Sequence, residues 1–218
     1  MRRALLLGAG GHSRVVLSIL AEVGTHSIAG VIDINKAHSD VRNSCELIMG
    51  VPVFALDALT QFKGSKDLDI FLAIGDCSLR SLWWKKMLDM EFSMPNLLSP
   101  KAIVHPSVIL GSANVICYGV FIGPEATIGN NNLINTGSIL EHESSLGNHC
   151  HIAPRSLIAG RSNIADNCFV GAGSVIIDRI SISEFTTVGA GAIVAADIKR
   201  PHGVYVGVPG RRMYKATK

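Results

Sequence analysis

A six-residue repeat runs without interruption through residues 104–199 and constrains the fold more than any other feature of the chain. Its first position, taken every sixth residue from Val104 to Val194, is Val, Leu or Ile in all sixteen hexads. The residue four places later is nearly always small or compact. Because α-helices repeat at about 3.6 residues and β-strands at 2, neither explains a period of six.

A short fixed period is typical of a solenoid, in which each unit buries its apolar edge only by stacking on its neighbours. An inward aliphatic residue, a small inward residue and polar residues between them predict short parallel strands joined by tight turns. We therefore expect a parallel β-helix of hexapeptides. The repeat resembles that of the left-handed β-helix acyltransferases, whose triangular coils have three hexads per turn.

The first 95 residues lack this repeat and alternate between strand-like and helix-like segments. We expect strands at 4–7, 28–33, 51–54 and 68–74, an irregular excursion at 35–50, and helices after the glycines at 8–11, at 56–62 and at 79–90. The last helix is predicted to bury Leu82, Trp83, Met87 and Met90. This alternation predicts a small parallel, Rossmann-like α/β sheet with a nucleotide-type crevice at the carboxyl ends of its strands.

These patterns divide the chain into four parts. We expect an α/β domain at 1–95, a linker at 96–103, the left-handed β-helix at 104–199, and a C-terminal loop and tail at 200–218.

The glycine-rich turn Gly8-Ala9-Gly10-Gly11-His12-Ser13 joins the first strand to the first helix. Glycines let a phosphate approach the backbone, and the helix N-terminus offers free N–H groups. The full dinucleotide fingerprint is absent, so a tight turn that binds nothing is the alternative. Asp33 ends the second strand, where an acid accepts hydrogen bonds from a nucleotide; the alternative is a cap.

Composition excludes several classes of function. A net charge of +3 over 218 residues, with no basic run or aromatic platform, argues against nucleic-acid binding. No segment approaches the ~20 apolar residues of a membrane span, and glycine and histidine interrupt the apolar start, so we expect a cytoplasmic protein. The five cysteines form no CxxC pair. Cys150 and Cys168 share one inward hexad position and are expected to stack as small fillers rather than form a disulfide or metal site.

The GAGGH turn, the strand ending in Asp33, the AIGD segment and the hexapeptide coil together resemble the sugar acetyltransferases that modify bacterial surface glycans. Some members N-acetylate the 4-amino group of a nucleotide-linked 4-amino-4,6-dideoxysugar, and others O-acetylate sialic acid. The resemblance implies acetyl-CoA as co-substrate and a nucleotide-sugar site in the N-terminal domain, formed by Gly10, Gly11, His12, Asp33 and Gly75. Ser13 stands where the family usually has a further glycine.

The segment Leu140-Glu141-His142-Glu143 places a histidine between two carboxylates, in a coil otherwise rich in Gly, Ser, Asn and Ala. Imidazole takes up a proton at neutral pH, and a neighbouring carboxylate orients it. By resemblance, His142 is the general base and Glu143 its orienting acid. A solvated surface histidine is the alternative.

The same resemblance implies further contacts with acetyl-CoA. His151 is expected at the acetyl group, where an N–H polarises the thioester carbonyl, and Asn135 and Gly160 match other contacts. Arg155 departs from the family, which usually has glycine there; either closing onto the cofactor channel or reaching a CoA phosphate suits its side chain. Arg211 and Arg212 in the final loop are either donors to CoA phosphates or exposed terminal charges.

The sequence therefore predicts an N-acetyltransferase of nucleotide-linked 4-amino-4,6-dideoxysugars in surface-glycan biosynthesis. By resemblance we also expect a homotrimer with each active site between two coils. O-acetylation of sialic or another nonulosonic acid is one alternative, and a binding or scaffold solenoid without catalysis is the other.

Overall fold

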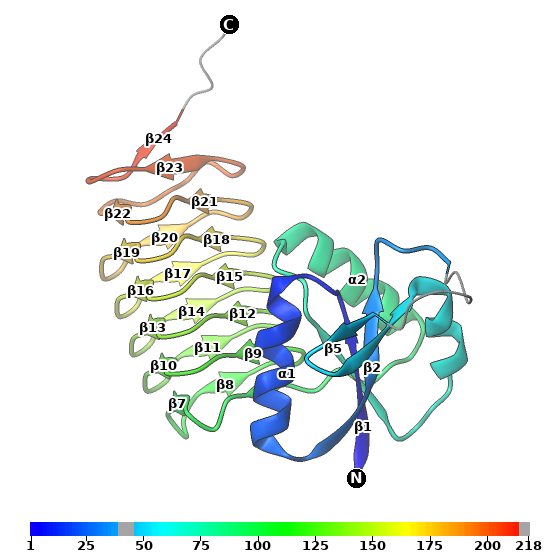
Figure 1. Cartoon of the computed structure of the whole chain (residues 1–218). Helices are drawn as coiled ribbons and strands as arrows, with labels where there is room; N and C mark the ends of the chain where they lie inside the picture. Colours follow the sequence, from blue (N-terminus) through cyan, green and yellow to red (C-terminus); the bar gives the residue numbers. More distant parts are fainter. Residues whose placement is uncertain (39–45, 214–218) are drawn as a thin grey trace, which may run out of the picture. The chain divides into compact units, whose positions relative to one another are not determined.

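A computed structural model describes residues 1–38 and 46–213 (Figure 1). The chain divides into two compact units, Met1–Pro100 and Lys101–Lys218. Residues 39–45, which include Cys45 and part of the expected excursion at 35–50, lie outside the described residues.

The first unit is an α/β sheet with helices. Its elements are β1 (Arg2–Leu7), α1 (Gly11–Val23), β2 (His26–Asp33), β3 (Leu47–Ile48), β4 (Val51–Ala55), the 3-10 helix η1 (Leu56–Phe62), β5 (Leu68–Leu72), α2 (Cys77–Asp89) and β6 (Leu97–Leu98). The sheet order is β3-β4-β2-β1-β5, with β4, β2, β1 and β5 parallel and β3 antiparallel to β4. The predicted parallel α/β sheet is thus confirmed, with β1 between β2 and β5.

Two helices of this unit add detail to the prediction. The helix expected at 56–62 is present as a 3-10 helix. In α2, Leu82 is 49% exposed, so its predicted burial is wrong, whereas Trp83 and Met87 are buried as predicted. Arg80 takes the inward position instead, because its guanidinium donates to backbone carbonyls at the end of the neighbouring strand segment.

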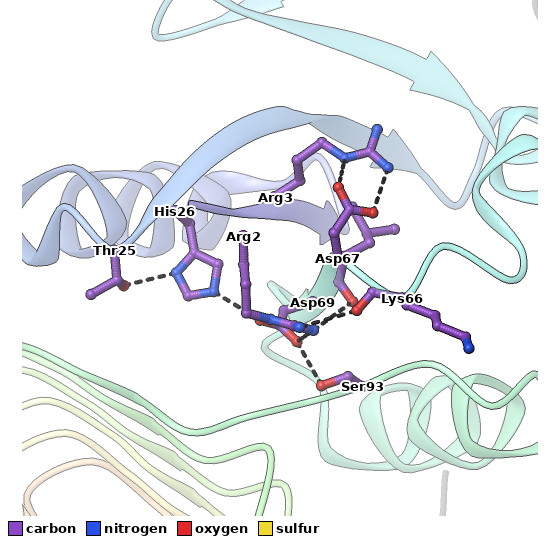
Figure 2. Close-up of polar contacts among 9 residues, drawn as sticks. Arg2, Arg3, Thr25, His26, Lys66, Asp67, Asp69 and Ser93 are labelled. Carbon is purple, nitrogen blue, oxygen red and sulfur yellow. Dashed lines mark hydrogen bonds and ion pairs between the residues drawn. The ribbon is translucent and has the colours of Figure 1, made fainter.

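A polar network ties together the amino ends of β1, β2 and β5 (Figure 2). Asp69, 3% exposed, accepts hydrogen bonds from Arg2 Nη2 at 2.6 Å, from Ser93 Oγ at 2.6 Å and from His26 Nε2 at 2.9 Å. Burial of Asp69 opposes its ionisation, but the bonds from Arg2, Ser93 and His26 outweigh this effect and lower the pKa of Asp69 to about 2. The network therefore lies at the end of these strands opposite the glycine-rich turn.

The second unit is a left-handed parallel β-helix, as predicted. Its two-residue strands are β7 (Ile103–Val104), β8 (Ile109–Leu110), β9 (Val115–Ile116), β10 (Phe121–Ile122), β11 (Thr127–Ile128), β12 (Leu133–Ile134), β13 (Ile139–Leu140), β14 (Ser145–Leu146), β15 (His151–Ile152), β16 (Leu157–Ile158), β17 (Asn163–Ile164), β18 (Phe169–Val170), β19 (Val175–Ile176), β20 (Ser181–Ile182), β21 (Thr187–Val188) and β22 (Ile193–Val194). From β7 to β19, each pairs in parallel with the strand three places on, as in Phe121 with Ile139. One coil is therefore eighteen residues, or three hexads.

The hexad pattern accounts for the interior of the coil. The second residue of each strand from Ile116 to Val194 is buried, and the small fifth positions from Asn114 to Ile198 are buried as well. Residues with φ near +60° recur every sixth place from Ala113 to Gly191 and form the corners. The final strands, β23 (Val204–Val206) and β24 (Arg211–Arg212), pair antiparallel at the C-terminal end.

Two of the three outer faces of the coil differ clearly in polarity. The sheet β22-β19-β16-β13-β10-β7 turns only apolar side chains outward, and we name it the apolar face. Its outward residues are Ile103, Phe121, Ile139, Leu157, Val175 and Ile193. The sheet β20-β17-β14-β11-β8 instead presents Ile109, Thr127, Ser145, Asn163 and Ser181.

No helix within residues 1–38 and 46–213 is both long and apolar enough to cross a membrane. The four described cysteines form no disulfide. Cys150 and Cys168 are buried on successive coils and donate through Sγ to the carbonyls of Ala165 (3.1 Å) and Ser183 (3.2 Å). They therefore fill the coil interior as expected.

Candidate active site

The turn that carries His142 and Glu143 follows β13 and is fixed by both neighbouring coils. The Glu143 N–H donates to the Pro124 carbonyl at 2.9 Å, and the His142 carbonyl accepts from the Arg161 N–H at 3.1 Å. Glu143 has a φ of 56°, as corner residues of this coil do. The backbone beneath both side chains is thus held from the coil before and the coil after.

Glu143 is the flanking acid that contacts the imidazole, since its Oε2 lies 2.9 Å from His142 Nδ1. The hydrogen bond from His142, and then the charge of Arg161, lower the pKa of the Glu143 carboxyl. A carboxylate only accepts hydrogen bonds, so Nδ1 carries a proton, and in the neutral ring Nε2 then has the lone pair. The His142 side chain is 45% exposed, so a ligand can reach it.

Gly160 lies against the His142 ring. A Cβ added there would stand 2.6 Å from His142 Cε1 and 2.7 Å from Nε2, closer than atoms in contact approach. Gly160 occupies the place of His142 one coil further on. Glycine at this position therefore leaves the space that the imidazole fills, which is a different role from the acetyl-CoA contact that the resemblance implies.

Arg161, which the sequence did not single out, also belongs to this group. Its Nε is 3.0 Å from Glu143 Oε2. Its only sequence signal is its spacing, eighteen residues after Glu143. That signal becomes readable once one coil is known to take three hexads.

Asn135 and His151 form a second group, on the sheet that includes β12 and β15. Asn135 follows β12, and its Nδ2 lies 3.4 Å from Nε2 of His151. The His151 ring packs edge-on against Phe169, with ring centroids 5.1 Å apart. The structure thus brings these two predicted residues together, and Phe169, which sequence reasoning missed, orients the imidazole.

The two groups lie at different corners of the coil. His142, Glu143 and Gly160 follow strands of the apolar face, whereas Asn135 precedes one of them. The apolar face therefore runs between the two groups, and within one chain the predicted site residues of the coil form two clusters rather than one.

Arg155 lies at the same corner as Asn135. Its φ is 57°, and the equivalent places on other coils, Gly119, Gly137, Gly173 and Gly191, are all glycine with similar φ. Its Cγ packs near Gly137, 3.5 Å from where a Cβ would stand. Among these five equivalent places only residue 155 has a side chain, and it lies at the corner that carries Asn135.

The predicted nucleotide-sugar residues converge at one edge of the α/β sheet. Gly10, Gly11 and His12 follow β1, Asp33 ends β2, and Gly75 follows β5. Because these three strands are parallel neighbours, their carboxyl ends lie side by side. The structure thus brings together the substrate-binding residues that the resemblance implied.

The glycine turn is shaped for close approach. Gly8 has a φ of +116°, and a Cβ there would stand 2.8 Å from the Ala73 carbonyl oxygen. Gly10 and Gly11 face open space. No side chain caps the N-terminus of α1 and its first turn has no acid, so its N–H groups suit an anion. Ser13 is accommodated because its buried hydroxyl donates to the Gly10 carbonyl at 2.6 Å.

Two further residues shape this edge. Asp33 accepts from the Asn35 N–H at 3.0 Å through Oδ1, which is the turn-capping contact that sequence analysis left open as the alternative. Arg80, missed from the sequence, donates through Nη1 to the carbonyls of Ile74 at 3.0 Å and Gly75 at 3.1 Å. This buried guanidinium fixes the backbone on which Gly75 lies.

The C-terminal loop borders a half-open pocket of about 420 Å³ at the end of the coil. Tyr205, Asp197, Pro209, Arg211 and Arg212 are among the residues that line it. The two arginines therefore border a hollow rather than a flat surface. The lining thus carries two guanidinium groups and one carboxylate, that of Asp197.

Two family models match the chain. The PglD N-terminal domain matches residues 3–87, and the bacterial transferase hexapeptide (six repeats) matches residues 125–160. No curated protein matches the chain in sequence.

Solved structures match over nearly the whole chain. A histidine-to-asparagine mutant of perosamine N-acetyltransferase from Caulobacter crescentus, in complex with CoA and GDP-perosamine, is 31% identical, covers 98% of this chain and 97% of its own, and has a TM-score of 0.89. PerB from the same organism, with the same ligands, is 33% identical over 97% of each chain, at a TM-score of 0.88. The acetyltransferase domain of PglB from Neisseria gonorrhoeae, in complex with acetyl coenzyme A, is 25% identical over 97% of this chain and 99% of its own, at 0.86.

Two features found above, the α/β unit with its glycine turn and the hexapeptide coil with its histidine and glutamate, occur in one chain that matches these enzymes from end to end. The chain therefore belongs to the PglD-like family of sugar acetyltransferases and is an acetyl-CoA-dependent acetyltransferase.

Proposed function

We propose that the protein transfers the acetyl group of acetyl-CoA to the 4-amino group of a nucleotide-linked 4-amino-4,6-dideoxysugar. The observation that carries this proposal is the geometry of His142, whose Nδ1 lies 2.9 Å from Glu143 Oε2, which leaves Nε2 as the basic nitrogen of the neutral ring. The match to an enzyme whose structure holds CoA and GDP-perosamine supports the class of acceptor.

His142 acts as the general base in this proposal. The amine nitrogen forms a bond to the thioester carbonyl carbon, the carbon–sulfur bond breaks and the CoA thiolate leaves. His142 Nε2 accepts the proton that the nitrogen loses, and this proton then passes to the thiolate. Glu143 stabilises the imidazolium that forms in between, because its carboxylate already bonds to Nδ1.

The acceptor site of the proposal lies at the carboxyl edge of the α/β sheet. Gly10 and Gly11 leave room for a diphosphate beside the α1 N-terminus, which is what a nucleotide sugar brings. Gly75 also faces open space, and Asp33 turns its Oδ2 toward Lys36 Nζ at 3.9 Å, so a ligand hydroxyl or base N–H would share this oxygen with the ammonium group. His12 is the remaining residue of the proposed acceptor site.

Acetyl-CoA supplies the activated acetyl group, and two regions of the coil suit it. Asn135 and His151 offer amide and imidazole groups at one corner, where the glycine column leaves a strip free of side chains for a narrow ligand arm. Arg211 and Arg212 border the C-terminal cavity, where charge-assisted bonds to phosphate are favoured.

The assembly proposed is a homotrimer with active sites between subunits. The apolar face supports it, because in a single chain its continuous column of six outward apolar side chains is half-buried, and at Ile103 exposed, rather than covered. The two groups of site residues flank this face, so packing it against a second copy brings the His142 group of one subunit toward the Asn135 and His151 group of the next.

A substrate panel tests the function. Purified protein with acetyl-CoA is offered GDP-, UDP- and dTDP-linked 4-amino-4,6-dideoxysugars and, separately, free sialic acid, and products are identified by mass spectrometry. We expect N-acetylation of a nucleotide-linked amino sugar and roughly 100-fold slower turnover in His142→Ala. Acetylation of sialic acid alone, or undiminished turnover in His142→Ala, contradicts the proposal.

A further inference from the structure

The side chain of Arg161 reaches back along the coil to the Glu143 carboxylate. Its Nε is 3.0 Å from Oε2, the same oxygen that lies 2.9 Å from His142 Nδ1. We infer that Arg161 is a positioning residue that holds Glu143 in the conformation in which this carboxylate fixes the tautomer of His142. The inference rests on the proposed function, since it assigns His142 the role of base.

Glu143 needs such a partner because it lies on the surface. Its side chain is 42% exposed and has three rotatable bonds, so one contact with an adjacent residue competes with water and with rotational freedom. A second, charge-assisted bond to the same oxygen restricts the carboxylate to the side on which the imidazole lies. Arg161 makes that second bond.

The coil geometry makes the arrangement specific. Gly160 and Arg161 stand eighteen residues after His142 and Glu143, and strands β13 and β16 pair in that register. The Arg161 N–H also donates to the His142 carbonyl at 3.1 Å. The following coil thus supplies both the space for the imidazole and the guanidinium for its acid.

Arg161→Gln tests the role, with Arg179→Gln as a matched control. Arg179 lies one coil further at the same corner, has a φ of 59° and is 3.7 Å from Asp178. An exposed ion pair stabilises a fold little, so neither variant is expected to change the melting temperature. We expect Arg161→Gln to lower kcat about tenfold, with KM for both substrates within about twofold, while Arg179→Gln behaves as wild type.

A double-mutant cycle shows whether Arg161 acts through Glu143. In a Glu143→Gln background, Arg161→Gln is expected to lower kcat by less than about twofold. An undiminished effect in that background overturns the inference. So does a raised KM with kcat preserved, because this pattern means that Arg161 contacts a substrate directly.

Nitrogen-15 NMR of labelled histidines reads the tautomer without any substrate. The His142 signal is assigned by its loss in His142→Ala, and we expect an Nδ1-protonated ring in the wild type and a mixture of tautomers in Arg161→Gln. An unchanged tautomer in the variant overturns the inference whatever the substrate is. If the tautomer changes but no amino sugar is acetylated, the inference stands and the proposed function alone fails.

Discussion

The imidazole of His142 depends on the glycine beside it as well as on the acid that bonds to it. Gly160 and Glu143 together set where the ring lies and which nitrogen carries the proton. Both contacts are short-range and lie at the surface. Activity and stability should therefore separate when these residues are changed.

Gly160→Ala tests whether this glycine leaves the space that the His142 ring occupies. The added Cβ would meet only the far end of the His142 side chain, which can swing into solvent. We expect kcat to fall at least about tenfold while the melting temperature changes little. Steady-state kinetics and thermal unfolding of the same preparation measure both.

Gly147→Ala provides the contrast. A Cβ there would stand 2.9 Å from the Asp166 backbone nitrogen, so the coil itself must shift. This variant should lose stability before it loses chemistry. If Gly160→Ala instead loses as much stability as Gly147→Ala, the claim that Gly160 serves to leave room for the imidazole is wrong.

Asp69 makes the stability of the α/β unit dependent on acid pH. Its pKa of about 2 in the folded protein lies below the ordinary 3.8, so its contribution is present above about pH 4 and is lost as pH falls toward 2. The shift corresponds to about 2 kcal/mol. Urea unfolding of wild type and Asp69→Asn should differ by about this amount at pH 6 and converge near pH 2. A constant difference across this range contradicts the assignment.

At the scale of the coil, one interior column shows how different side chains fill one site. Asn114 and Asn132 each donate through Nδ2 to a carbonyl fifteen residues on, at 2.9 Å. The thiols of Cys150 and Cys168 donate to carbonyls at the same offset. Asparagine and cysteine are therefore equivalent here because each is compact and each offers a donor.

Cys150→Asn should accordingly be tolerated. The new amide can donate to the Ala165 carbonyl and accept from the residue 168 N–H, as Asn132 already accepts from the Cys150 N–H at 2.7 Å. We expect the free energy of unfolding to change by less than about 1 kcal/mol, whereas Cys150→Leu should cost about 1–3 kcal/mol by overpacking. Denaturant unfolding measures both, and equal losses would show that size alone matters.

The elements were predictable to the extent that they depend on periodicity along the chain. Sixteen aliphatic residues in phase specify the β-helix, because no other regular structure buries every sixth residue. The same in-phase spacing placed Cys150 and Cys168 on successive coils. The glycine turn and Asp33 converge because parallel strands end at one edge.

Features that depend on contacts across coils or on hydrogen bonds to the backbone were not predictable from pattern. Leu82 was expected to be buried because it is apolar. Arg80 is buried instead, because its guanidinium donates to backbone carbonyls. Nothing in the sequence distinguishes Arg161 from other corner residues. Only the eighteen-residue register places it next to Glu143. In both cases an arginine found acceptors that a hydropathy pattern does not display.

At the scale of the whole molecule, the proposed trimer would account for the separation of the coil's expected site residues into two groups. The groups flank this face, so a single coil does not bring them together. In the proposed trimer, closing three copies around their apolar faces would cover the column and juxtapose unlike groups at each contact. Assembly and activity should therefore be lost together.

Leu157→Glu tests this link. Leu157 points outward at the centre of the apolar face, half-buried between Ile139 and Val175, so a carboxylate there is tolerated in a single chain but opposes packing of a second copy. We expect the wild type to sediment as a trimer and the variant as a monomer with its fold intact, its acetyl transfer reduced at least about 100-fold. Asn163→Glu, on the sheet β20-β17-β14-β11-β8, should leave both mass and rate unchanged. A monomeric wild type, or a monomeric Leu157→Glu with full activity, would mean that each chain completes its own site, and the Asn135 and His151 group would then need another role.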